Sequence, residues 1–488
     1  MLPRVYFLPG SVLGVLALGI APALAAPPTT LAQALASAYY NNPTLQQQRA
    51  VLRQTDEEVP AALSGWRPTV TFQGQLGRVS GVEKYASTGI NPITNLPVTQ
   101  QTRVPENGTS KVAQLTVTQP IYTGGKVTSQ TRQAKNDVYA ARAQLLSQEQ
   151  TVFYNVIQAY VSVVTDRKLL DLQENNQQVM QRQVHDTRTQ FNLGEITMTS
   201  VAQAQASLAQ AEQQVNVAQG NLEIARENFR QLVGDYPAAH LVPPQPLVLP
   251  VDGQAQSGQM ALKNNPDVIA AEFSDASAKD AVNVAFSALM PQLSLQASAY
   301  NQSGSSGQNI FQRGASLTGQ LTVPLYQGGQ EYSAIRSARA KEQQAFAAVL
   351  VAQRKAYANA AQAWEGMTSS RGAVLAANAE IKANAIALDG TEREELVGTR
   401  TTLDVLNAQQ SLLNAQIQQV QNISQMVNYS YNIALAIGRL TARDLNLPVQ
   451  EYDDQKYYAA VKFAGFGTGG DADHDAGLAP DGTMLNTP

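Results

Sequence analysis

Four stretches of the chain alternate between apolar and neutral polar residues. In the first, Val70, Phe72 and Leu76 alternate with Thr and Gln residues, and similar alternation recurs in residues 113–118, 292–299 and 316–323. A period of two is typical of β-strands with one apolar and one polar face. The sequence therefore predicts four strands, arranged in two pairs.

The polar faces of these strands carry Gln, Ser and Thr but no charged residue. Such faces favour a membrane β-barrel, with lipid outside and water inside, over a soluble half-buried sheet, which would show the same alternation. Four strands cannot close a water-filled pore, because lumen width grows with strand number. We therefore expect several copies of the chain to share one barrel.

Two long runs without proline, from Gly124 to Gly194 and from Gly328 to Gly398, are rich in Ala, Gln and Leu. Each run predicts one uninterrupted helix, about 100 Å long at ~1.5 Å per residue. A second helix is expected after each run, and after Gly194 it carries a coiled-coil seam of large residues and alanines. Its positions are Val201, Ala204, Leu208, Ala211, Val215, Ala218, Leu222, Ala225 and Phe229. The second copy keeps this pattern at Val405, Ala408, Leu412 and Ala415.

The two halves of the chain resemble each other. Asn41-Asn42-Pro43 recurs 223 residues later as Asn264-Asn265-Pro266, and the segment from Pro120 to Gly234 recurs 204 residues later. The extra 19 residues of the first half fall in an expected loop, roughly 81–110. We interpret this pattern as a tandem duplication. It divides the chain into a first repeat at 26–234, a Pro-rich connector at 235–257, a second repeat at 258–445 and a C-terminal segment at 446–488.

Both ends of the chain have a biased composition. Residues 1–25 contain Arg4, an apolar core at Ser11–Ile20 and the small-residue sequence Ala23-Leu24-Ala25, which together predict a secretory signal peptide. No later run of 18 apolar residues exists, so any membrane crossing must use strands. The Gly/Asp/Pro-rich end, Gly465–Pro488, is expected to be disordered.

Composition and charge exclude several classes of function. The chain has no cysteine, and its three histidines are scattered without metal-ligand spacing. Neither a nucleophile motif nor a phosphate-binding loop is present, so we expect no enzyme and no cofactor. Without Arg4, the only charged residue of the first 25, the chain has 33 basic and 38 acidic residues, a net charge of −5. No basic surface is evident, so nucleic acid is not an expected partner.

The two turns that follow the long helices are candidate functional sites. They contain residues 194–200 and 398–404, where the chain reverses direction. Asp404 lies in the first turn of the next helix, where the helix dipole favours an anion. Helix capping alone explains Asp404 in a single chain. In a closed trimer, three such carboxylates would face one another across the axis and select cations.

The order of these motifs strongly resembles the TolC family of outer-membrane efflux and secretion ducts. The resemblance extends from about Thr30 to Leu447 and rests on Asn-Asn-Pro, Pro-x-Tyr-x-Gly-Gly, the long helices and the sequence Leu403-Asp404-Val405-Leu406-Asn407. It implies an α+β membrane protein that forms a homotrimer, in which twelve strands make one β-barrel and twelve helices make a coiled-coil tunnel in the periplasm. It also implies a mixed equatorial layer, to which the connector would belong. The absence of an N-terminal cysteine matches the non-lipidated branch.

The gate residues of the family match this chain unevenly. Asp404 matches the first acidic position of the constriction, whereas the second is Asn407 here. Arg400 matches the arginine that holds the tip closed, but its usual acidic partner falls at Ser200, beside Thr199, and the usual tyrosine falls at Glu395. The resemblance therefore implies an altered network, in which Glu395 is a candidate partner for Arg400.

The resemblance also implies partners and a location. The expected protein is a passive exit duct of a tripartite efflux pump, embedded in outer-membrane lipid and extending into the periplasm. A periplasmic adaptor would dock at the tips and join the duct to an inner-membrane transporter. The docking residues would be Asn192, Leu193, Gly194, Leu396, Val397 and Gly398. A type I protein secretion duct is the main alternative, and a soluble periplasmic coiled-coil scaffold is a second.

Overall fold

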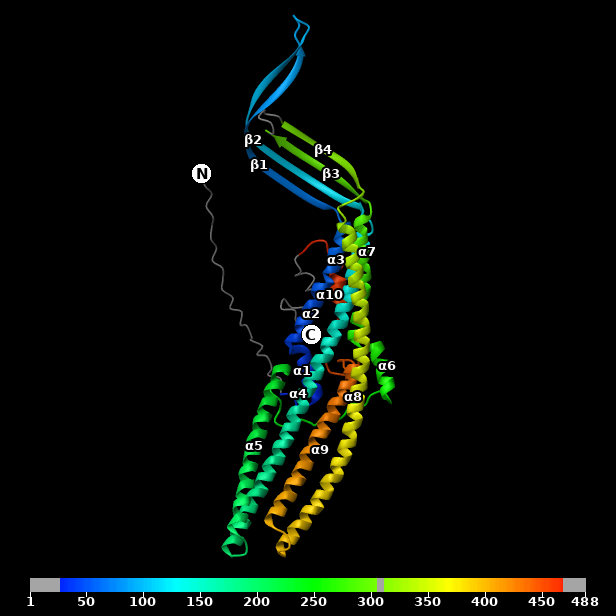
Figure 1. Cartoon of the computed structure of the whole chain (residues 1–488). Coiled ribbons are helices and arrows are strands. Elements are labelled where there is room, and N and C mark those ends of the chain that lie inside the picture. The colour runs from blue at the N-terminus through cyan, green and yellow to red at the C-terminus, as the bar shows by residue number, and fades with distance from the viewer. Residues whose placement is uncertain (1–26, 305–310, 468–488) are drawn as a thin grey trace, which may run out of the picture.

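A computed structural model describes residues 27–304 and 311–467. The predicted signal peptide and nearly all of the predicted disordered tail lie outside these residues. The molecule is elongated, with a sheet at one end, two helical hairpins at the other and short helices packed along the middle (Figure 1). Within the two described ranges, no helix is both long enough and apolar enough to cross a membrane.

Both halves of the described chain have nearly the same order of elements. The first contains α1 (Leu31–Asn41), α2 (Pro43–Asp56), α3 (Glu58–Leu63), β1 (Thr69–Ile90), β2 (Pro97–Tyr122), α4 (Lys126–Asn192) and α5 (Met198–Val233). The second contains α6 (Gln254–Asn264), α7 (Pro266–Phe286), β3 (Gln292–Ser303), β4 (Phe311–Thr322), α8 (Gln330–Leu396) and α9 (Thr402–Ala436), followed by α10 (Lys456–Val461). The single helix α7 occupies the place of α2 and α3.

The repeated Asn-Asn-Pro motif fixes the short helices to the long hairpins. The second asparagine of each copy, Asn42 or Asn265, caps the next helix by accepting from the backbone N–H two residues later, at 3.0 and 2.9 Å. The proline takes the first helical position, where its missing N–H costs no helical hydrogen bond. The Asn42 side chain also donates to the carbonyl of Leu232 in α5, and Asn265 donates to that of Ala436 in α9.

The four strands form one antiparallel sheet in the order β1-β2-β3-β4. Paired residues share a face of an antiparallel sheet, and the register puts the apolar positions of all four strands on the same face. One row across the sheet contains Phe72, Leu115, Ala299 and Ala315, and the adjacent row on the opposite face contains Thr71, Thr116, Ser298 and Ser316. The predicted alternation is confirmed.

The expected loop at 81–110 is wrong. β1 and β2 stay paired as far as Ile90 and Pro97, so the first hairpin extends well beyond the four-stranded part of the sheet (Figure 1). Only residues 91–96 form the turn, which Asn91 closes by accepting from the N–H of Ile93 at 2.9 Å. The segment is rich in Val and Thr, and these residues favour extended backbone despite the prolines and glycines among them.

The long helices have the predicted extent. α4 and α8 contain 67 residues each, and each begins after a glycine pair with positive φ. α5 packs antiparallel to α4, and α9 packs antiparallel to α8. The predicted seam of α5 is largely buried, with Leu208 and Val215 only partly so. In α9 Val405 and Ala415 are buried, but Leu413 rather than the expected Leu412 is buried beside them.

The core lies in the middle of the molecule, where α1 and α2 pack against the part of α4 that is nearer the sheet (Figure 1). Leu35, Phe153, Tyr160 and Phe229 are almost completely buried there. Residues 234–253 form neither helix nor strand. They pack against the same core, and the hydroxyl of Tyr160 lies 2.8 Å from the carbonyl oxygen of Val242. The N–H of Leu247 also donates to the hydroxyl of Ser430 in α9 at 3.0 Å, so this segment contacts both hairpins.

A buried carboxyl lies where the C-terminal segment packs against α2 and α4. Asp56 is 1% exposed, and within the described chain neither of its carboxyl oxygens has a hydrogen-bond partner. Burial raises the pKa of Asp56 from 3.8 to about 7; the charge of Arg142 opposes this rise, and Asp454 and Glu57 add to it. The Nε atom of Arg142 lies 3.5 Å from an oxygen of Asp454.

Asp56→Asn is expected to stabilise the protein more at pH 8 than at pH 5. The folded-state pKa of Asp56 lies above the unfolded value, so the folded chain binds the extra proton. Its stability therefore falls as pH rises from about 4 to about 7, and asparagine removes this loss because it does not ionise. Thermal unfolding midpoints at the two pH values measure the effect. Asp252→Asn, at an exposed position, is the control, and equal shifts in both variants would contradict the prediction.

Candidate functional site

The tips of the two hairpins are built alike. Gly194 and Gly398 have φ values of 79° and 78°, a region that residues with a side chain rarely adopt. The N–H of Gly194 donates to the carbonyl of Phe191, and that of Gly398 donates to Glu395, both at 2.9 Å. The next residue in each turn donates five residues back, which completes a Schellman motif. Both turns are therefore determined by glycine and by backbone hydrogen bonds.

The tip residues expected to dock a partner are exposed. Leu193, Leu396 and Val397 are 70%, 81% and 74% exposed, although all three are apolar. A Cβ atom added to Gly194 or Gly398 would meet no other atom within 4 Å. Each tip thus presents apolar side chains around a glycine that leaves space for another surface, and Asn192 is exposed beside the first.

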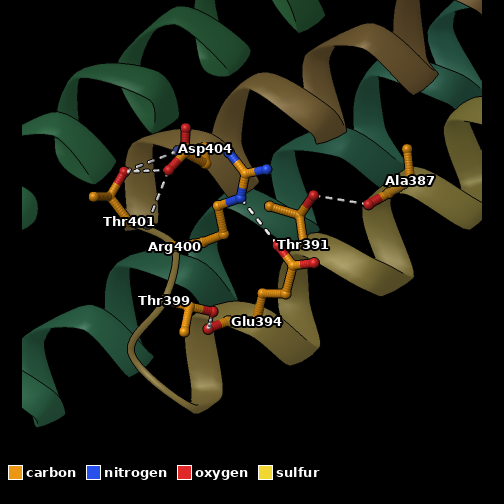
Figure 2. Close-up of polar contacts among 7 residues, drawn as sticks. All are labelled: Ala387, Thr391, Glu394, Thr399, Arg400, Thr401 and Asp404. Atoms are coloured by element: carbon orange, nitrogen blue, oxygen red, sulfur yellow. Dashed lines mark hydrogen bonds and ion pairs between the residues drawn. The ribbon is translucent and has the colours of Figure 1, made fainter.

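Arg400 binds its own hairpin. Its Nε lies 2.9 Å from a carboxylate oxygen of Glu394, in the last turn of α8 (Figure 2). The candidate pair of Arg400 with Glu395 is therefore wrong, because one residue along a helix turns the side chain about 100° away from its neighbour. The hydroxyl of Thr399 also donates to the backbone carbonyl of Glu394, at 2.9 Å. Two hydrogen bonds to Glu394, one to its carboxylate and one to its backbone carbonyl, thus connect the second turn to the end of α8.

Asp404 caps the start of α9. Its carboxylate accepts from the N–H of Thr401 at 2.9 Å and from the Thr401 hydroxyl at 2.8 Å, and its own N–H donates back to that hydroxyl at 3.3 Å (Figure 2). These hydrogen bonds to Thr401, and then the positive charge of Arg400, lower the pKa of Asp404. Within one chain, the helix-cap interpretation accounts for all of these contacts.

The remaining predicted gate residues lie apart from this cluster. Asn407 is exposed one turn farther along α9. Thr199 and Ser200 begin α5 on the other hairpin, and no hydrogen bond or ion pair joins them to Arg400 in the part of the chain that the structure describes. Of the predicted gate residues, the structure therefore places only Arg400 and Asp404 in one cluster. Arg400 contacts Glu394 and Asp404 contacts Thr401.

Glu394 and Thr401 were not predicted as site residues. Thr401 has a readable signal, because Thr401-x-x-Asp404 is a variant of the capping-box pattern. Glu394 has none, since it is one of two adjacent glutamates and only the path of the turn decides between them. Across residues 27–304 and 311–467, no group of three or more His, Asp or Glu residues could hold a metal ion.

Comparisons with known proteins agree with this architecture. A family model described as outer membrane efflux protein matches residues 34–235 and 258–439. The outer membrane efflux protein BepC of Brucella suis biovar 1 (strain 1330) is 33% identical over 446 residues, which cover 90% of this chain and 91% of BepC. The outer membrane protein TolC of Escherichia coli (strain K12) is 27% identical over 367 residues, 70% of this chain and 71% of TolC.

Solved structures share the fold. The outer membrane protein VceC from Vibrio cholerae superposes with a TM-score of 0.71 at 20% identity, over 84% of this chain and 96% of VceC. The family model and the BepC match each span most of the sequence and both of its halves. On these grounds the chain belongs to the outer membrane efflux protein family, whose members are outer-membrane channels.

Proposed function

We propose that three copies of this chain form the exit duct of a tripartite efflux pump for small molecules. Four strands from each copy would make a twelve-stranded barrel in the outer membrane, and four long helices from each would make the wall of a periplasmic tunnel. The duct would carry no energy source, so a periplasmic adaptor would join it to an inner-membrane transporter. Family membership favours this function over a soluble scaffold.

The observation that carries the proposal is the uncovered apolar face of the sheet. Phe72, Leu76 and Leu317 lie on this face and are 72%, 75% and 69% exposed. Soluble monomers rarely expose a contiguous apolar surface of this kind. Lipid on this face, with water on the Thr/Gln/Ser face, satisfies both sides. The edge strands β1 and β4 would pair with the next copies, so that no edge stays open.

The two outer helices of the hairpins also expose apolar side chains. α4 packs against α9, so α5 and α8 lie at the outer edges of the four-helix layer (Figure 1). Apolar side chains are exposed on both, including Val217 and Ile224 on α5 and Leu375 and Ile386 on α8. In a closed wall, α5 of one copy would cover α8 of the next.

Engineered cysteines can test this wall. The chain has no cysteine of its own, so Val217→Cys with Leu375→Cys gives one reactive pair per copy. Both positions are exposed, and each lies about 20 residues from its hairpin turn. At a rise of ~1.5 Å per residue, the two positions are therefore at similar distances from the tips of the hairpins. We expect oxidised outer membranes to contain covalent trimers, with each single-cysteine variant as the control. Monomers alone, or recovery of the protein without detergent, would contradict the duct.

The contact between Glu394 and Arg400 is expected to help hold the tip closed. Glu394→Gln should release Arg400 and raise the open fraction of single channels in planar bilayers. Both side chains are 53% exposed, so the thermal unfolding midpoint should stay unchanged. Glu395→Gln is the matched control, because it removes the same charge one position away without touching the pair. An equal rise in the open fraction for the two variants would contradict the prediction, because it would show that the loss of one negative charge, and not the loss of the Glu394–Arg400 contact, opens the tip.

A further inference from the structure

The positively charged residues of the sheet share one of its two faces. Lys111 pairs with Leu76, Arg78 pairs with Thr109, and Arg313 pairs with Asn301. Alternation along each strand puts all three cations on the face that carries Phe72 and Leu115. The apolar face therefore ends in positive charge, on the side toward the long β1–β2 hairpin.

The hairpin continues the same pattern. Lys84 lies directly opposite Arg103, and both continue the alternation of the apolar face. Like charges directly opposite each other destabilise a sheet in water. The sequences of the four strands contain only two acidic residues, Glu83 and Glu106, against these five basic ones. We name the five cations the basic face: Arg78, Lys84, Arg103, Lys111 and Arg313.

The side chains of the basic face are available to a ligand. All five are exposed, and none makes an ion pair or a side-chain hydrogen bond with another residue of the described chain. Arg313 also lines a shallow depression with Phe72, Leu115 and Asn301, so this cation adjoins the apolar surface directly. Charge and apolar contact thus meet in one continuous surface.

We propose that the basic face binds the phosphate groups of a phosphorylated glycolipid in the outer leaflet. The proposal rests on the proposed function, which turns the apolar face toward lipid and the hairpin away from the periplasmic helices. β3 and β4 have 12 residues each, slightly more than the roughly 9–11 that a tilted strand needs to cross the hydrocarbon. Arg78, Lys111 and Arg313 lie at the outer end of this four-stranded part and therefore fall at the headgroup level, and Lys84 and Arg103 lie farther out along the β1–β2 hairpin.

The chemistry of the basic face suits phosphate. Arginine presents a planar fork of donors that matches phosphate oxygens in two contacts, and lysine adds a compact charge. A phosphate between Lys84 and Arg103 would also remove the repulsion between these two cations.

The test measures lipid binding by the purified trimer in nonionic detergent. The trimer is titrated with bisphosphorylated lipid A, and bound lipid is counted by native mass spectrometry. The variant R78Q/K84Q/R103Q/K111Q/R313Q is expected to bind at least tenfold more weakly, and raised salt should weaken wild-type binding. Lipid A without phosphates should bind both proteins equally weakly. K168Q/K382Q, exposed lysines on α4 and α8, is the control and should bind like the wild type.

Equal binding of bisphosphorylated lipid A by the wild type and the five-residue variant would overturn the proposal, as would equal binding of lipid with and without phosphates. If the five-residue variant does not form trimers, R78Q/K111Q decides, because these two exposed residues lie at the outer end of the four-stranded part of the sheet. This variant is expected to bind several-fold more weakly, and unchanged binding overturns the proposal. Conductance distinguishes failure of this proposal from failure of the proposed function. Trimers that conduct ions but show no phosphate-dependent lipid binding would contradict lipid binding by the basic face and leave the duct proposal intact.

Discussion

Gly398→Trp and Gly194→Trp are each expected to abolish efflux while the protein still assembles as a trimer in the outer membrane. Both glycines lie at the exposed ends of the hairpins, with open space around them and apolar side chains beside them. A tryptophan would fill the space that a docked adaptor needs. Antibiotic susceptibility measures efflux, and cross-linking of Val217→Cys with Leu375→Cys in the same background measures assembly.

Alanine separates docking from folding at these positions. Both glycines have positive φ, so any side chain strains the turn, by roughly 1–2 kcal/mol for the left-handed conformation. Gly398→Ala and Gly194→Ala carry this strain without the bulk, and we expect near-normal efflux from both. Loss of efflux with alanine as well would mean that these glycines serve the fold of the turn, and normal efflux with tryptophan would remove the tips from the docking surface.

Much of the fold could be predicted because its signals are local and periodic. The alternation around Phe72 and Leu115 determined which residues share a face, and the register agrees. The glycine pairs before α4 and α8 marked the helix starts, because positive φ at Gly125 and Gly329 suits little else. The length of the β1–β2 hairpin could not be predicted, because its strands mix Val and Thr with Gly and Pro, and pairing between strands decides the outcome.

The candidate site was harder to predict than the fold. Asp404 was identified by its place after a turn, and its cap follows from Thr401 three residues earlier. The partner of Arg400 depends on which of two adjacent glutamates the turn brings near, and no sequence pattern encodes that choice. Contacts between copies leave no local pattern either, because a single chain exposes both an interface and a free surface in the same way. The roles of Ser200 and Asn407 therefore stay predictions.

Asp404→Asn is expected to remove most of the cation selectivity of the duct without destabilising α9. The hydrogen bonds from Thr401 and the charge of Arg400 lower the pKa of Asp404, so its carboxylate is ionised at neutral pH. Asparagine keeps an oxygen that can accept from Thr401, so the helix cap persists while the charge is lost. Reversal potentials in planar bilayers under a salt gradient measure the selectivity. Thr401→Ala is the matched control, because it weakens the cap and leaves the charge in place.

Asn407→Asp is expected to have the opposite effect and to strengthen block by multivalent cations. It would add three carboxylates one turn along α9 from Asp404, and two stacked rings attract a multivalent cation more strongly than one. With Asn407 the wild-type duct should be weakly cation-selective and only modestly blocked, because water in the pore screens a single ring. The same bilayers, titrated with a trivalent cation, measure the block. If neither variant changed selectivity or block, Asp404 would serve only as a helix cap and the constriction would lie elsewhere along the tunnel.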